Sequence, residues 1–162
     1  CLSSLALSNE DRSLILHLDS YHHFSPWSNA IRQGINQVFA NNEKVELCNE
    51  HMDSKRISTP DYFELLAQLY AHKYKNLKFQ AIIASDNNAL NFMLKYRDQI
   101  FPDVPVVFCG INNFDPSVLK GHQGFTGIGE SLAIGETISQ GLKLFPQTEK
   151  LVVITDQTTS GQ

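Results

Sequence analysis

The stretch from Phe79 to Asn113, FQAIIASDNNALNFMLKYRDQIFPDVPVVFCGINN, decides the expected fold. Its apolar run Ala81–Ala84 is typical of a strand covered on both faces, as parallel strands are. Asn87 or Asn88 is expected to cap a following helix, and Val106–Cys109 is expected to form a second buried strand. The stretch therefore predicts two parallel strands joined by a helical crossover.

The same alternation of apolar runs and amphipathic segments extends along the rest of the chain. Strands are expected at Leu14–Leu18, Val45–Met52, Phe125–Gly129 and Leu151–Thr155, and helices are expected to begin at Pro26 after Ser25, at Pro60 after Thr59, and near Ile134. Strands that alternate with helices in this way predict an α/β fold with a doubly wound parallel sheet.

Length and composition exclude several classes of protein. The 162 residues suffice for one domain, or for one domain and a fragment of another. With 42% hydrophobic and 19% charged residues the chain is expected to be globular. A net charge of −4 without a lysine or arginine cluster predicts no binding to nucleic acid or to anionic lipid. Contact with a membrane is expected only through segments of a longer parent protein.

The first residues allow three interpretations. Residues 1–12 form either a terminal tail or the remnant of a secretory signal, because Ala6-Leu7-Ser8 has the small-x-small pattern of a cleavage site. Cys1 is alternatively the lipid-attachment residue of a mature lipoprotein. The residues alone leave these interpretations open.

Polar residues follow each expected strand of the central sheet. Since strand-to-helix loops of a parallel sheet emerge at one edge, these side chains are expected to surround a shared concavity that holds a small polar ligand, particularly its carboxylate. Helix capping is the alternative role for Asn87, and core packing is the alternative role for Trp27. The candidate ligand-binding residues are Ser20, Tyr21, His22, Trp27, Asp86, Asn87, Asn112 and Asn113.

Histidines near this edge suggest a metal site only weakly. His22 and His23 are adjacent, so in an extended loop their rings point apart. Together with Asp19 or His51 they would make a mixed site, but no pair of histidines at i and i+4 supports it. We therefore expect no metal site and no cofactor.

Acidic residues near the strand ends support an alternative function. Asp19, Asp53 and Asp86 would suit magnesium-dependent phosphoryl transfer or a receiver-type domain. Such sites crowd acids on one cation with a lysine nearby, and Lys55 is the lysine available here. The sequence contains no GxxxxGK phosphate loop and no G-x-S-x-G elbow. We therefore expect no catalytic residues.

Several motifs in order carry a resemblance to a known family. They are SYH at Ser20–His22 with Pro26-Trp27, MDSKR at Met52–Arg56, PDY at Pro60–Tyr62, IASDNNAL at Ile83–Leu90, FPDVPVVFCGINNF at Phe101–Phe114 and FTG at Phe125–Gly127. This set resembles the ABC-transporter substrate-binding proteins with a type I periplasmic-binding fold. The resemblance extends to the branch that serves as the extracytoplasmic sensor region of bacterial histidine kinases and diguanylate cyclases.

The resemblance implies an organisation and a function. Members have two lobes that close on a ligand, so residues 13–129 would be the first lobe and residues 130–162 the start of a second, truncated lobe. The implied function is solute binding at the periplasmic face of the bacterial inner membrane, in a transporter or as a sensor domain. The domain itself would not be an enzyme, although a kinase or cyclase module would follow in a sensor. An amino acid or a small carboxylate is the implied ligand.

The tail after Glu130 is expected to need a partner. Ile134, Ile138, Leu142 and Phe145 give its helix an apolar face, and the strand Leu151–Ile154 is apolar too. Exposed apolar faces tend to find cover. We therefore expect this tail either to pair with a second copy of the chain as a homodimer or to fold back on residues 13–129.

Overall fold

A single five-stranded sheet forms the centre of the molecule in the computed structural model, which describes residues 12–131 and 133–154. The strands are β1 (Ser13–Asp19), β2 (Val45–His51), β3 (Phe79–Ser85), β4 (Val106–Asn112) and β5 (Phe125–Glu130). Their order in the sheet is β2-β1-β3-β4-β5, and every neighbouring pair is parallel. The predicted parallel α/β sheet is confirmed.

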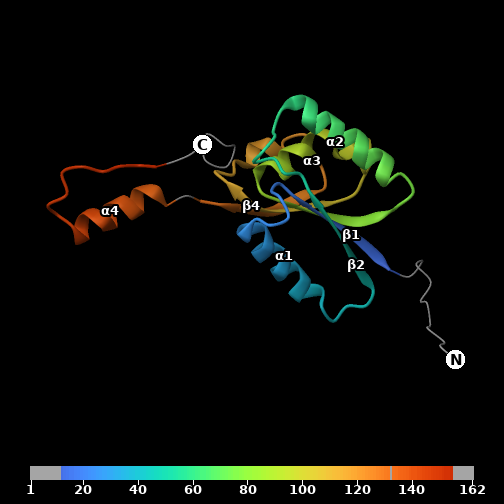
Figure 1. Ribbon diagram of the computed structural model, residues 1–162, viewed down its shortest axis with the longest axis horizontal. Helices are drawn as coiled ribbons and strands as arrows, with labels where there is room; N and C mark the ends of the chain where they lie inside the picture. Colours follow the sequence, from blue (N-terminus) through green and yellow to red (C-terminus); the bar gives the residue numbers. More distant parts are fainter. Residues whose placement is uncertain (1–11, 132, 155–162) are drawn as a thin grey trace.

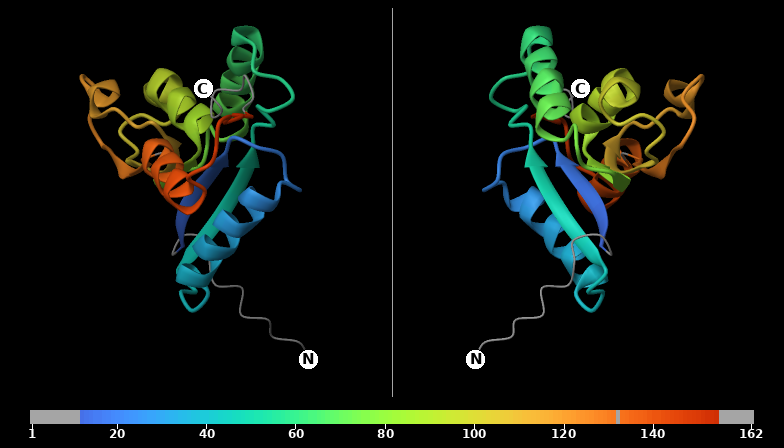
Figure 2. Two further views of the ribbon diagram at one scale, coloured as in Figure 1. Left: turned by 90° about the vertical axis from the view of Figure 1, so that its left-hand side faces the viewer. Right: turned by 90° about the vertical axis from the view of Figure 1, so that its right-hand side faces the viewer.

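Helices cover both faces of this sheet. The covering helices are α1 (Pro26–Phe39), α2 (Pro60–Lys73) and α3 (Asn87–Ile100); the described chain also has a 3₁₀ turn, η2, at Pro116–Leu119 and a further helix, α4 (Ile134–Leu144). Helix α1 lies on one face, while α2 and α3 lie side by side on the other (Figures 1 and 2). The fold is therefore doubly wound, as the alternation of elements predicts.

Two helix starts follow the sequence signals and one does not. Pro26 and Pro60 occupy the first turns of α1 and α2, and the Thr59 side chain accepts a hydrogen bond from the Tyr62 N–H. The expected cap of α3 by Asn87 or Asn88 is wrong, because both residues lie inside the helix. Asp86 holds the cap position, with a left-handed φ of 74°.

The main core lies between the sheet and the pair α2–α3. Leu16, Leu18, Ile82 and Ala84 alternate along β1 and β3 and are fully buried. Phe108 of β4 continues this layer, and aromatic side chains of both helices cover it, among them Tyr70 and Phe92. This face supplies the larger share of the buried apolar surface, which drives folding.

The opposite face of β1 carries polar side chains. The His17 ring is fully buried and shares hydrogen bonds with Asn49 Oδ1 at 3.1 Å and Ser85 Oγ at 3.0 Å, which lie on the two neighbouring strands. Burial lowers the pKa of His17, so the neutral ring is favoured. A row of side-chain hydrogen bonds thus crosses three strands beneath α1.

The residues that follow β5 do not adopt all of the structure that the sequence predicts. Helix α4 lies away from the sheet (Figure 1), and Leu144 and Phe145 at its end are 75% and 68% exposed. The expected strand at Leu151–Thr155 is wrong, because residues 151–154 have no regular structure and are exposed, while Thr155 lies outside the described residues. Folding back on the sheet is not observed for these side chains. Pairing with a second copy stays a prediction.

The central strand β3 offers a test of the core. We expect Ile82→Ala to lower the free energy of unfolding by about 2–5 kcal/mol, because the side chain is fully buried and leaves a cavity. Ile128→Ala on β5 is the matched control, since Ile128 is 73% exposed, and should change stability by less than about 0.5 kcal/mol. Urea unfolding measures both, and equal losses would contradict this assignment of the core.

Candidate functional site

The carboxyl ends of β1 and β3 form the topological switch point of the sheet. From β1 the chain continues into α1 on one face, and from β3 it continues into α3 on the other face. The two loops therefore diverge, and ligands bind open α/β sheets at such a crevice. Five of the candidate residues meet around it: Tyr21, Trp27, Asp86, Asn87 and Asn112, called here the switch-point cluster.

Ser20 is a structural joint behind this cluster. Its fully buried hydroxyl donates a hydrogen bond to the Ser85 carbonyl at 2.9 Å and accepts one from the Ala89 N–H at 2.8 Å. The Ser20 carbonyl accepts hydrogen bonds from the N–H and the hydroxyl of Ser54. Ser20 thus links β1 to β3, to α3 and to the loop after β2. Its hydroxyl and carbonyl groups are both engaged in these internal hydrogen bonds and not directed toward a ligand.

Tyr21 and Asp86 form the polar centre of the cluster. The Tyr21 hydroxyl donates to Asp86 Oδ2 at 2.5 Å, across the boundary between β1 and β3. Asp86 is only 3% exposed, and among the described residues its Oδ1 has no hydrogen-bond partner. Burial raises the pKa of Asp86, and the hydrogen bond from Tyr21 offsets this only in part.

Trp27 closes the cluster on the side of α1. Its ring packs edge-on against Tyr21, with centroids 5.3 Å apart. It also covers Gly110 so closely that a Cβ atom at Gly110 would lie 2.5 Å from Trp27 Cζ2. Gly110 itself has a φ of 67°, which favours glycine. The Trp27 ring is therefore neither a core side chain nor freely exposed, because it packs between the Tyr21 ring and the backbone of β4 at Gly110.

Asn87 and Asn112 join the start of α3 to the end of β4. The Asn87 side chain donates to the Asn112 carbonyl at 3.1 Å and accepts from the Asn112 N–H at 2.9 Å. Beside this pair lies a small pocket of about 60 Å³, lined among others by Asn87, Asn112 and Asn113. The three asparagines therefore line one hollow at the carboxyl edge of the sheet.

Lys55 brings a positive charge to the cluster. Its ammonium lies over the Tyr21 ring, 5.1 Å from the centroid, and its charge acts to lower the pKa of Asp86. The sequence offered Lys55 only as a partner for phosphoryl transfer. The structure places it where a carboxylate at the crevice would meet a cation.

The histidines and the other acids lie toward β2. His22 Nδ1 is 4.0 Å from Asp53 Oδ1, in the loop after β2. The fully buried Asp19 carboxylate faces His51 Nδ1 at 3.4 Å, and His51 Nε2 meets His23 Nδ1 at 3.2 Å. Within residues 12–131 and 133–154, no group of three or more such ligands is arranged to hold a metal ion.

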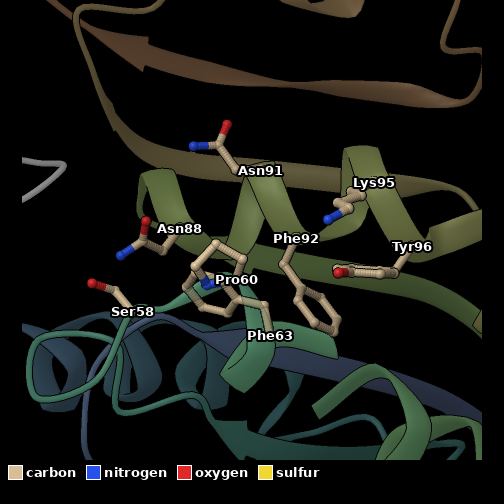
Figure 3. Close-up of a pocket in the computed structure, with 8 residues that line it drawn as sticks. All are labelled: Ser58, Pro60, Phe63, Asn88, Asn91, Phe92, Lys95 and Tyr96. Carbon is tan, nitrogen blue, oxygen red and sulfur yellow. The ribbon is translucent and has the colours of Figure 1, made fainter. Parts of the chain in front are cut away.

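A second hollow, the α2–α3 groove, lies between the starts of these two helices. Its volume is about 250 Å³, and its lining residues are Ser58, Pro60, Phe63, Asn88, Asn91, Phe92, Lys95 and Tyr96 (Figure 3). Sequence reasoning missed this groove, because Phe63 repeats at helical spacing like a core residue. The same reasoning missed that the Trp27 ring packs against Gly110. The available sequence signal was the glycine itself, which opens the segment GINN that resembles a turn.

Comparisons with known proteins add one distant likeness. No family model matches the chain, and no curated protein matches it. Among solved structures, 2-deoxy-scyllo-inosose synthase, crystallised with carbaglucose-6-phosphate, NAD⁺ and Co²⁺, is similar with a TM-score of 0.42 and 12% identity. The similar region covers 64% of this chain and 27% of the synthase chain. At these values the likeness supports neither an activity nor a ligand.

The contact of Trp27 with Gly110 is testable by fluorescence. We expect Gly110→Ala to cost at least about 2 kcal/mol of stability, through the positive φ and the clash with the ring, and to shift the emission of the single tryptophan. Gly34→Ala in α1 is the control, since nothing lies within 4 Å of its added Cβ, and it should stabilise by up to about 1 kcal/mol. Unchanged emission in Gly110→Ala would contradict the packing.

The buried carboxyl of Asp86 should make stability depend on pH. Because its folded pKa lies above the ordinary 3.8, the folded state binds the proton more tightly, and stability falls as pH rises from about 3.8 through the folded value. Asp86→Asn removes this loss. The variant should therefore gain stability relative to the wild type as pH rises, as measured by urea unfolding at several pH values.

Asp115→Asn provides a control of opposite sign. Hydrogen bonds from Ser117 lower the pKa of the exposed Asp115, so its carboxylate stabilises the fold increasingly as pH rises through the folded and ordinary values. This variant should lose stability relative to the wild type over that range. The same trend in both variants would argue against burial as the cause at Asp86.

Proposed function

We propose that this chain is a small-molecule binding domain without catalytic activity of its own. The observation that supports it most is the convergence of Tyr21, Trp27, Asp86, Asn87 and Asn112 at the switch point of the sheet. These side chains come from the loop after β1, the starts of α1 and α3, and the end of β4, and they offer aromatic surface, a carboxylate and amides in one place. Binding sites combine apolar surface with a few placed polar groups in this way.

The charges around Tyr21 favour a ligand with both signs. Asp86 lies on the hydroxyl side of Tyr21, and the Lys55 ammonium lies over its ring. A zwitterionic amino acid matches this pair, with its ammonium toward Asp86 and its carboxylate toward Lys55. A small carboxylate would use Lys55 alone. The α3 N-terminus contributes less than expected, because Ser20 already accepts from the Ala89 N–H.

The setting we propose is extracytoplasmic. It rests on the ordered motifs that resemble substrate-binding proteins and sensor regions, in which such a domain serves an ABC transporter or a membrane signalling protein. None of the helices in residues 12–131 and 133–154 has the length and apolar character that a bilayer crossing requires. The same motifs make a histidine kinase or diguanylate cyclase the output module of a sensor.

A receiver-type or phosphoryl-transfer domain is the second candidate. The strand order β2-β1-β3-β4-β5 is also that of flavodoxin-like and receiver folds. The acids that such chemistry would gather have separate neighbours here: Asp19 faces His51, Asp53 pairs with Arg56, and Asp86 binds Tyr21. A magnesium site needs these acids on one cation, so the arrangement favours binding over phosphoryl transfer.

A thermal-shift screen of amino acids and small carboxylates on the full-length protein tests the proposal. A ligand at about 100 times its Kd should raise Tm by at least about 3 °C, because it binds only the folded state. Tyr21→Phe and Lys55→Gln should each reduce that shift, since they remove the hydroxyl at Asp86 and the cation over the ring. Lys120→Gln, on the surface after η2, is the matched control.

Two results would count against the proposal. One is a screen in which no compound of either class raises Tm. The other is magnesium-dependent labelling by acetyl phosphate that Asp53→Asn or Asp86→Asn abolishes, which would favour the phosphoryl-transfer candidate.

A further inference from the structure

The walls of the α2–α3 groove are built from aromatic rings. Phe63 of α2 and Phe92 of α3 meet edge-on, with centroids 6.4 Å apart, and Phe92 packs against Tyr96 at 4.9 Å. Phe92 and Tyr96 are 3% and 7% exposed, so packing fixes their positions. The rings leave a cavity of about 250 Å³, which is the size for a compound of roughly ten non-hydrogen atoms rather than a drug-sized ligand.

One polar atom in this groove lacks a normal partner. The Tyr96 hydroxyl is buried on a residue that is only 7% exposed, and among the described residues it makes no hydrogen bond of normal geometry, although the Lys95 ammonium interacts with it closely enough to raise the pKa of Lys95. In Figure 3 it points toward Phe92, along the groove. Buried hydroxyl groups are nearly always hydrogen-bonded. An acceptor atom supplied by a ligand would satisfy it.

A cation stands at the rim beside this hydroxyl. The exposed Lys95 ammonium lies 4.8 Å from the centroid of the Tyr96 ring. Interaction with the Tyr96 side chain raises the pKa of Lys95, and the charge of Glu64 adds to this. The amides of Asn88 and Asn91 line the opposite end (Figure 3). The groove is therefore apolar inside and positive at one end.

We propose that the α2–α3 groove is a second ligand site, which binds a small aromatic carboxylate. The ring lies against Phe63 and Phe92, while the carboxylate accepts a hydrogen bond from Tyr96 and faces Lys95. An aromatic amine fits less well, because its charge would meet the Lys95 ammonium. The site is separate from the switch-point cluster. Asn87, which belongs to that cluster, bonds to Asn112 of β4, whereas the next residue, Asn88, lines the groove.

Calorimetry and ligand-observed NMR on the full-length protein with benzoate and indole-3-acetate test this site. Lys95→Gln should weaken binding about tenfold, and Tyr96→Phe about threefold to tenfold, as expected for a charged and a neutral hydrogen-bond donor. Glu64→Gln should strengthen binding, because it removes the neighbouring negative charge. Benzylamine should bind at least about tenfold more weakly than benzoate.

Matched variants separate this site from the fold and from the switch point. Lys75→Gln and Tyr70→Phe change the same residue types of the α2 region outside the groove lining and should leave benzoate binding unchanged. Tyr21→Phe should also leave it unchanged, while it weakens a ligand of the switch-point cluster. Unfolding curves confirm that Tyr96→Phe remains folded.

Three outcomes would overturn the proposal. They are the absence of binding by both carboxylates at millimolar concentration, equal affinity of wild type, Lys95→Gln and Tyr96→Phe, and loss of benzoate binding in Tyr21→Phe with no loss in Lys95→Gln. The last result would place the carboxylate at the switch point, and the function proposed above would stand without this second site.

Discussion

The hydroxyl of Ser20 is the point on which the carboxyl edge of the sheet depends. It is fully buried at the junction of β1, β3 and α3, where it bonds to the Ser85 carbonyl and the Ala89 N–H. The first N–H groups of a helix otherwise need a cap or water. Ser20 supplies an acceptor from another strand to the Ala89 N–H, and it also interacts with the Asp86 carboxylate, which holds the cap position and accepts a hydrogen bond from Tyr21. One buried hydrogen-bonded joint thus sets the geometry of the neighbouring polar centre.

The two faces of the sheet differ in character: one is packed with apolar side chains that stabilise the fold, and the other carries buried polar side chains. The face under α2 and α3 is packed with aliphatic and aromatic side chains such as Leu16 and Ile82. The face under α1 carries the hydrogen-bonded His17 and, near the carboxyl edge, the Asp19 carboxylate, which accepts a hydrogen bond from the Tyr21 N–H and lies 3.4 Å from His51 Nδ1. Most buried polar groups in proteins are hydrogen-bonded, and the hydrogen bonds of His17 and Asp19 hold the strand ends in register. A rigid edge of this kind suits a preformed binding site.

The start of α3 lies between two hollows of different character. Asn87 turns toward β4 and the polar pocket that it shares with Asn112, whereas Asn88 turns toward the aromatic groove beside Phe63. Successive helix residues point about 100° apart, so one short segment lines both. The charged side chain that lines the first hollow is Asp115, whereas the charged side chain that lines the aromatic groove is Lys95. Their preferences for ligands differ accordingly.

The sequence by itself determined the parallel sheet and the edge where polar side chains gather. A four-residue apolar run such as Ala81–Ala84, bounded by polar residues, is typical of a strand covered on both faces, and parallel topology sends every following loop to one edge. Contacts between distant segments decided the rest. The apolar run Leu151–Ile154 has no neighbouring strand among the described residues and forms none, since a strand needs a partner. Likewise, Asp86 has a left-handed backbone and Trp27 packs on Gly110 because of how β1, β3 and β4 lie relative to one another. No local sequence pattern predicts that arrangement.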